Sequence, residues 1–123
     1  PIVGSTRKVE QSLRSFLAGL DDSPLPTSSD RELTESLGQY AVLSFLYFPS
    51  SDYPRLRAAL TEAVEENDGT ALLSLVDERV NRSPDGRYLD NSTEAFYAVT
   101  CADMPYDGTV DEVARLAAQW QEV

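Results

Sequence analysis

Residues 68–103 read DGTALLSLVDERVNRSPDGRYLDNSTEAFYAVTCAD, a stretch in which helix starts, helical apolar spacing and a tight turn follow one another. Asp68 is placed to cap a helix that runs through apolar positions as far as Val80. The letters SPDG after it predict a turn, because proline and glycine favour turn backbone. Asn91 with Glu94 three residues later predicts the start of another helix. The stretch therefore predicts two helices joined by a turn, with a short strand as the alternative for the second, since AFYAVT is rich in β-branched and aromatic residues.

The same helical spacing continues towards the N-terminus. A first apolar stripe predicts a helix over residues 6–20, which the letters DDSP then end. Ser29 followed by Glu32 is a capping box, so a second helix is predicted over residues 30–49. A third is predicted over residues 52–64, with a proline in its first turn, where the missing amide proton costs little.

On the C-terminal side, Thr109 and Glu112 form another capping box and predict a last helix that carries Trp120. Nothing in the sequence repeats at a fixed period. The chain of 123 residues is long enough to bury a modest core. We therefore expect an all-α fold of about six helices, with residues 1–123 forming one domain.

Charge and composition limit the classes of partner. Ten basic and twenty-one acidic residues give a net charge of −11, which argues against nucleic acid and anionic membrane surfaces as partners. No apolar run reaches the roughly 18 residues of a membrane span. The acidic excess fits either simple solubility or a field that attracts cationic peptides and free amino termini.

Metal and cofactor chemistry find little support in the sequence. The chain has no histidine and one cysteine, so it lacks the usual zinc ligands. Calcium loops placed on Gly69, Gly86 or Gly108 each lack the carboxylate required at the twelfth position. We therefore predict no metal site and no cofactor.

Catalysis by a serine triad requires a residue that this chain lacks. A Ser-His-Asp triad needs an imidazole base, and the serine stands on a G-x-S-x-G elbow in α/β-hydrolases. The sequence contains neither a histidine nor that elbow, so we assign it no catalytic residue. It opens at Pro1 and has one methionine, Met104, which leads us to expect a piece of a larger protein.

The order of motifs resembles one enzyme family. Residues 68–103 follow roughly a pattern of the form DG-x-ALL-x-L-x-D, then R-x-x-DG-x-Y-x-N-x-x-EA-x-x-A[IV]-x-C-x-D, with two residues in place of one between Tyr88 and Asn91. Upstream runs fit PLP, LY-x-P and L-x-x-AL. This pattern is similar to that of secreted actinobacterial α/β-hydrolases, which include tripeptidyl aminopeptidases and cell-envelope serine proteases or esterases. The matching residues of the long motif are Asp68, Gly69, Leu72, Leu73, Leu75, Asp77, Arg82, Asp85, Gly86, Tyr88, Asn91, Glu94, Ala95, Ala98, Val99, Cys101 and Asp103.

The resemblance implies a helical lid inserted in a hydrolase core that lies outside this chain. It implies a serine upstream and an aspartate and a histidine downstream, in an enzyme that is secreted or held in the cell envelope. It also implies a disulfide between Cys101 and a cysteine in the flanking sequence. The alternative for Cys101 is a small buried apolar residue.

Four residues are candidates for substrate binding. Related aminopeptidases hold the free α-amino group of the substrate with acidic lid side chains, and Glu94 and Asp103 occupy matching positions. On one continuous helix we expect them on opposite-leaning or adjacent flanks, within about 100° of each other, where they can face the same cleft. Reciprocal capping of its own helix is the structural alternative for Glu94. Tyr53 and Tyr97, with neighbouring aromatics, either roof the substrate cleft or belong to the core.

These observations lead to two functional hypotheses. The first is a lid that controls access of a peptide or ester substrate to a serine hydrolase and helps bind the substrate amino terminus. The second is a free-standing acidic helical module that recruits a basic partner. A contiguous exposed apolar surface favours the lid, and a surface that is polar all round favours the module.

Overall fold

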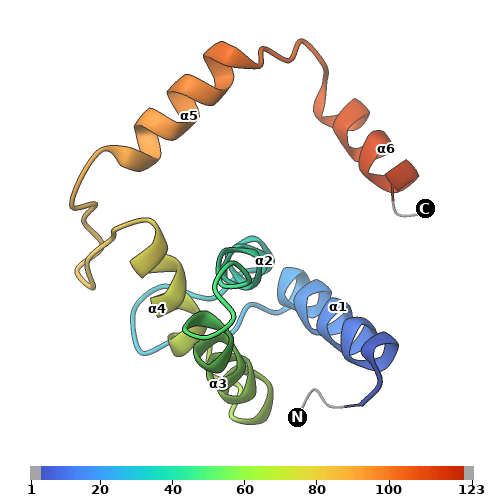
Figure 1. Cartoon of the computed structure of the whole chain (residues 1–123), viewed down its shortest axis with the longest axis vertical. Helices are drawn as coiled ribbons and strands as arrows, with labels where there is room; N and C mark the ends of the chain where they lie inside the picture. Colours follow the sequence, from blue (N-terminus) through green and yellow to red (C-terminus); the bar gives the residue numbers. More distant parts are fainter. Residues whose placement is uncertain (1–3, 121–123) are drawn as a thin grey trace. The chain divides into compact units, whose positions relative to one another are not determined.

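The computed structural model describes residues 4–120 and is all-helical over that range (Figure 1). No β-strand occurs there, and two isolated bridges join Leu25 to Leu33 and Arg82 to Tyr88. The prediction of an all-α fold with six helices is therefore confirmed, and the strand alternative within residues 93–100 is excluded. The helices are α1 (Thr6–Asp22), α2 (Glu35–Ser44), α3 (Asp52–Glu65), α4 (Thr70–Arg79), α5 (Ser92–Asp103) and α6 (Val110–Trp120).

The chain divides into two compact units, Pro1–Leu89 and Asp90–Val123. The assignment of residues 1–123 to a single domain stays a prediction. Within residues 4–120, none of the helices combines the length and the apolar character that crossing a bilayer would require.

The first unit has a hydrophobic core centred on α4. Helix α4 packs against α2 and α3, while α1 packs against α2. Leu72 of α4 and Leu33 are fully buried, and Phe45 at the end of α2 is 2% exposed. The other buried apolar residues are Leu20, Leu25, Ala41, Val42, Leu56, Ala59, Ala63, Leu73, Leu75 and Val76.

A short backbone bridge fixes the segment between α1 and α2. The amide of Leu25 donates to the carbonyl of Leu33 at 3.1 Å, and the amide of Leu33 donates back at 2.9 Å. Gly69 holds this segment against the start of α4, because its amide donates to the Pro26 carbonyl at 2.8 Å. A Cβ on Gly69 would lie 2.6 Å from the Cβ of Leu33, so only glycine fits without movement.

The backbone bridge between Leu25 and Leu33 shows that the predicted range of the second helix, residues 30–49, is wrong. The Leu33 amide is bound to Leu25, so a helix cannot continue through residue 33 from a start at Ser29. The Ser29 hydroxyl instead accepts from the Arg31 amide at 3.2 Å within a loop. Helix α2 begins at Glu35 and ends at Ser44, five residues before the predicted stop at Pro49.

The other predicted helix starts are close to the observed ones, but their capping groups differ. Thr109 and Glu112 form the predicted box, with the Thr109 amide 2.8 Å from Glu112 Oε2 and the Glu112 amide 3.3 Å from Thr109 Oγ1. Asn91 precedes α5 as predicted, yet its side chain makes no capping hydrogen bond. Asp90 caps instead, because its Oδ1 accepts from the Ser92 amide at 2.9 Å.

Asp68 caps α4 as the sequence predicts. Its Oδ1 accepts from the Thr70 amide at 2.8 Å. The Thr70 hydroxyl and amide favour the ionised carboxylate, and together they lower the pKa of Asp68 below its ordinary value of 3.8. A carboxyl whose pKa is lower in the folded state stabilises the fold above its unfolded pKa, and this contribution is lost as the pH falls through the folded value.

We therefore expect Asp68→Asn to destabilise the fold more at neutral pH than at acidic pH. Thermal unfolding midpoints of the wild type and the variant should differ near pH 7. The difference should narrow as the pH falls from the unfolded pKa of Asp68 through its lower folded pKa, because below the folded pKa the carboxyl is protonated in both states of the wild type. The control is Asp30→Asn, which removes an exposed carboxylate from the loop before α2. A gap for Asp68→Asn that is the same at every pH would contradict the capping role.

Candidate functional site

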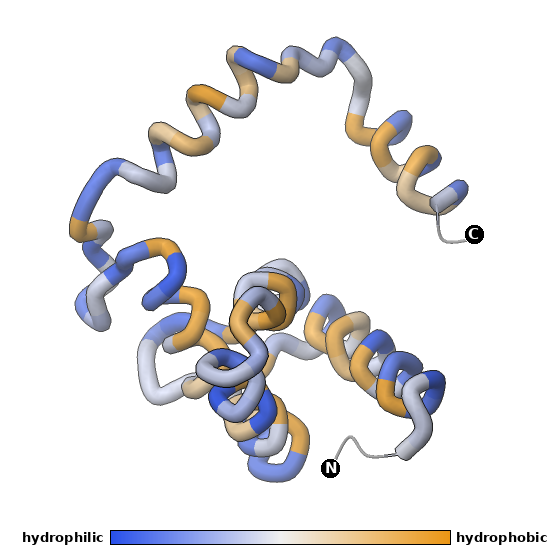
Figure 2. The backbone as a smooth tube through the Cα atoms, in the orientation of Figure 1, coloured by the Kyte–Doolittle hydropathy of each residue, from blue (hydrophilic) through white to orange (hydrophobic). Residues whose placement is uncertain are grey.

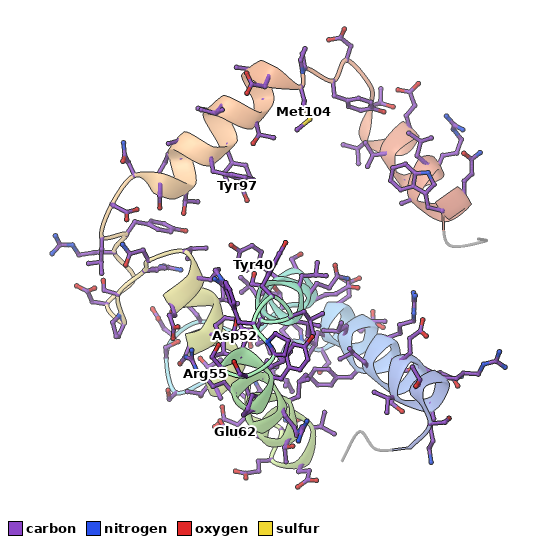
Figure 3. The ribbon with its side chains drawn as sticks, in the orientation of Figure 1. Tyr40, Asp52, Arg55, Glu62, Tyr97 and Met104 are labelled. Atoms are coloured by element: carbon purple, nitrogen blue, oxygen red, sulfur yellow. The ribbon has the colours of Figure 1, made fainter. Side chains whose placement is uncertain are left out.

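Helix α5 carries three of the four predicted substrate-binding residues but does not gather them on one side. Two of the three, Glu94 and Tyr97, share a face of the helix with Cys101, because these residues recur at spacings of three and four. Tyr97 is labelled in Figure 3. Asp103 lies nine residues after Glu94 on the same continuous helix. Nine residues correspond to about 180° of rotation and about 13 Å of rise, so the two carboxylates point to opposite sides. The expected separation of within about 100° is therefore wrong.

Glu94 stands in the first turn of α5 with its carboxylate unused. The reciprocal capping pair with Asn91 does not form, since Asn91 makes no side-chain cap. Within residues 4–120, Glu94 takes part in no side-chain hydrogen bond or ion pair. The residue is exposed, so the carboxylate is accessible to a cationic group.

The aromatic residues and the thiol of α5 are also exposed. Tyr97 and Phe96 meet edge to face, with ring centroids 5.5 Å apart, and both remain more than half exposed. Cys101 is an exposed free thiol, which excludes its alternative reading as a buried apolar residue. Tyr53 lies apart from them in sequence, on α3 of the first unit, and is 39% exposed. The core alternative is therefore wrong for these aromatics, and their role in substrate binding stays a prediction.

A polar cluster around Phe45 was missed by sequence reasoning. The guanidinium carbons of Arg55 and Arg79 lie 5.2 and 5.0 Å from the centroid of the Phe45 ring, as cations do over aromatic faces. Arg55 also forms a two-bonded pair with Glu78, at 2.9 and 2.5 Å. This pairing lowers the pKa of Glu78 and raises that of Arg55.

Arg79 is the centre of this cluster. It donates to the Ser44 carbonyl at the end of α2 and lies 3.5 Å from Asp52 Oδ2 at the start of α3. Asp52, labelled in Figure 3, is 7% exposed. Its Oδ1 accepts from the Ser51 hydroxyl at 2.9 Å, and its Oδ2 has no hydrogen bond. Arg79 thus joins the ends of three helices. The cluster contains no nucleophile next to a base, so its chemistry is that of a structural clamp.

Two surfaces of large apolar side chains remain uncovered within their own units. In the second unit, none of the residues of α5 and α6 is buried. In the first unit, an aromatic corner occupies the last turns of α2 and the turn before α3. We define this corner as Tyr40, Leu43, Leu46, Tyr47 and Phe48.

Metal ligands are not gathered in the described part of the chain. Among residues 4–120, no group of three carboxylate or thiol side chains is placed to hold a metal ion.

Comparisons with known proteins found no relative. No family model, curated protein or solved structure matches the chain. The exposed apolar surfaces and the Glu94 carboxylate are the features of this chain that point to a function.

The clamp leads to a prediction about stability. Arg79→Ala should lower the free energy of unfolding by about 2 kcal/mol, because the Asp52 carboxylate would stay buried without its cation. Urea unfolding of the variant measures this loss. Adding Asp52→Asn to Arg79→Ala should recover part of it, since a neutral amide is cheaper to bury.

The matched control is Arg14→Ala, which removes an exposed pair with Glu10 on α1. That pair should contribute at most about 0.5 kcal/mol. Equal losses for the two arginine variants would show that Arg79 is not a clamp.

Proposed function

We propose that this chain is the helical lid of a larger secreted serine hydrolase, a peptidase or esterase, and that it docks on the catalytic core through α5 and α6. The observation that carries the proposal is the set of large apolar side chains that these two helices hold without burying any of them. They are Phe96, Tyr97, Val99, Val110, Val113 and Trp120. Exposed apolar surface of this extent marks a place where another surface docks.

The size of the second unit supports the same conclusion. Asp90–Val123 is shorter than the roughly 40 residues that a domain needs to fold without staples or a partner. Helices α5 and α6 have 12 and 11 residues, lengths at which isolated helices are marginal in water. A docking surface would supply the burial that the unit lacks.

Helix α6 has the pattern of a docking helix. Its four large apolar residues and Ala117 lie within about 120° of the helix circumference, and its charged residues lie on the other side. Figure 2 shows apolar and polar positions alternating along it. The residues of this apolar stripe are Val110, Val113, Leu116, Ala117 and Trp120.

The catalytic residues would lie in the hydrolase core, and the lid would control the access of the substrate to them. This chain has no histidine, so the proposed triad lies in the flanking polypeptide. A lid of this kind restricts entry, excludes water when closed and orients the substrate. The resemblance of residues 68–103 to hydrolase lids supports this assignment.

The charge of the second unit supports the rival role, an acidic module for a basic partner. Residues 90–123 contain seven carboxylates and one basic residue, Arg115. A module would bind its partner without any hydrolase in the same polypeptide. The lid requires a G-x-S-x-G elbow before this segment and a histidine after it, and the absence of either from the longer polypeptide contradicts the lid.

Docking of α6 can be tested through Arg115, the only tryptic site within residues 90–123. Trypsin should cut there quickly in the isolated chain and slowly in the full-length enzyme, because a docked helix resists local unfolding. Val113→Asp in the enzyme should restore fast cleavage, since it would bury a charge in the apolar contact.

Ala118→Asp is the matched control, because it adds the same charge on the polar side of α6. Cleavage at Arg115 should stay slow in this variant. Equally fast cleavage in the isolated chain and in the full-length enzyme would contradict docking.

The role of Glu94 is tested in the same enzyme. If its carboxylate binds the substrate ammonium, Glu94→Gln should lower kcat/KM for peptides with a free amino terminus by about 2 kcal/mol, roughly thirtyfold. N-acetylated peptides and simple esters lack the ammonium and should be hydrolysed as before. Asp103→Asn is the control, since Asp103 lies on the opposite side of α5. This variant should change kcat/KM by the same factor for free and for N-acetylated peptides. Equal losses on free and acetylated peptides would remove Glu94 from the binding site.

A further inference from the structure

The aromatic corner of the first unit presents five large apolar side chains to solvent. Tyr47 is 76% exposed, Leu43 65% and Phe48 59%, while Leu46 and Tyr40 are 48% and 40% exposed. The turn is held in place, because the Leu46 amide donates to the Leu43 carbonyl at 3.4 Å and the Asp52 amide donates to the Phe48 carbonyl at 2.8 Å. These two hydrogen bonds fix the backbone that carries the corner.

This corner is also free of charge. Residues 36–51 form a run of sixteen residues without a charged side chain, the longest in the chain. The two arginines that pack on Phe45, the residue before Leu46, are each paired with a carboxylate, Arg55 with Glu78 and Arg79 with Asp52. In a chain of net charge −11, a contact made by this uncharged run brings no carboxylate of its own to the second copy.

We infer that the aromatic corner is the contact through which two copies of this chain form a dimer. A two-fold dimer places the same surface on both copies, so the corner must be compatible with itself. A neutral surface of leucine, tyrosine and phenylalanine meets that requirement. Aromatic enrichment and depletion of charge also characterise the centres of protein interfaces. Dimerisation through the corner is independent of the lid role.

The size of the corner indicates a weak dimer. With 150–250 Å² for each complete aromatic side chain, the exposed parts of the five residues present roughly 500 Å² per copy. Two copies would then bury about 1,000 Å², where specific interfaces begin. The dimer should therefore dissociate on dilution.

Helix α6 is the competing apolar surface, and its charges disfavour self-association. Asp107, Asp111 and Glu112 lie at its N-terminal end, and no basic residue stands between them. A second copy would add the same carboxylates to the contact, and like charges repel. The corner carries no such penalty.

Sedimentation equilibrium of the purified chain over roughly micromolar to millimolar concentrations tests the inference. We expect a monomer–dimer equilibrium that shifts towards dimer as salt rises, because salt screens the repulsion between two acidic copies. The double variant Tyr47→Ser with Phe48→Ser should raise the dissociation constant at least about tenfold. Leu43→Glu should do the same by placing a charge in the contact, and circular dichroism confirms that each variant is folded.

The matched control is Val113→Ser with Trp120→Ser, which removes exposed apolar side chains from α6. This variant should dimerise as the wild type does. A monomer at every concentration would overturn the inference. A dimer that survives the corner variants and is lost in the α6 variant would overturn it as well.

Discussion

The packing of α4 against both α2 and α3 is the contact on which the first unit depends. Four of the ten residues of α4 are buried, so this short helix is covered on more than one side. Its N-terminal end is fixed by Asp68 and by the close contact of Gly69 with Leu33. Its C-terminal end is fixed by Arg79, which reaches the ends of α2 and α3. Apolar burial supplies the driving force, and the polar contacts at the two ends fix the position of the helix.

The sequence predicted helix number and most helix starts because these depend on residues close together in the chain. The capping-box prediction at Ser29 fails, because such local patterns do not include contacts from distant parts of the chain. Ser29 with Glu32 and Thr109 with Glu112 are chemically the same motif, yet only the second forms a box. At Ser29 the difference lies in contacts from elsewhere, since the Leu33 amide pairs with Leu25 and Gly69 packs against Leu33. Tertiary contacts thus override a local preference.

The candidate site was predictable to a smaller extent. Glu94, Tyr97 and Cys101 share a face of α5, which helical spacing alone implies. The opposite placement of Glu94 and Asp103 also follows from spacing, once α5 is known to continue unbroken between them. The clamp at Arg79 was not predictable, because Ser44, Asp52 and Arg79 are brought together only by the packing of three helices. No pattern along the chain marks such a meeting.

Gly69 also affects how this fold can change over evolutionary time. A side chain at this position would collide with Leu33, whereas the hydrogen bond from its amide to Pro26 depends on backbone alone. A larger residue at 69 becomes acceptable only if the residue at 33 becomes smaller or moves. Positions 33 and 69 should therefore vary as a linked pair among sequences that adopt this fold, with glycine at 69 wherever a bulky residue fills 33. Substitutions at the two positions are then not independent, and the order in which they occur decides whether the intermediate sequence folds.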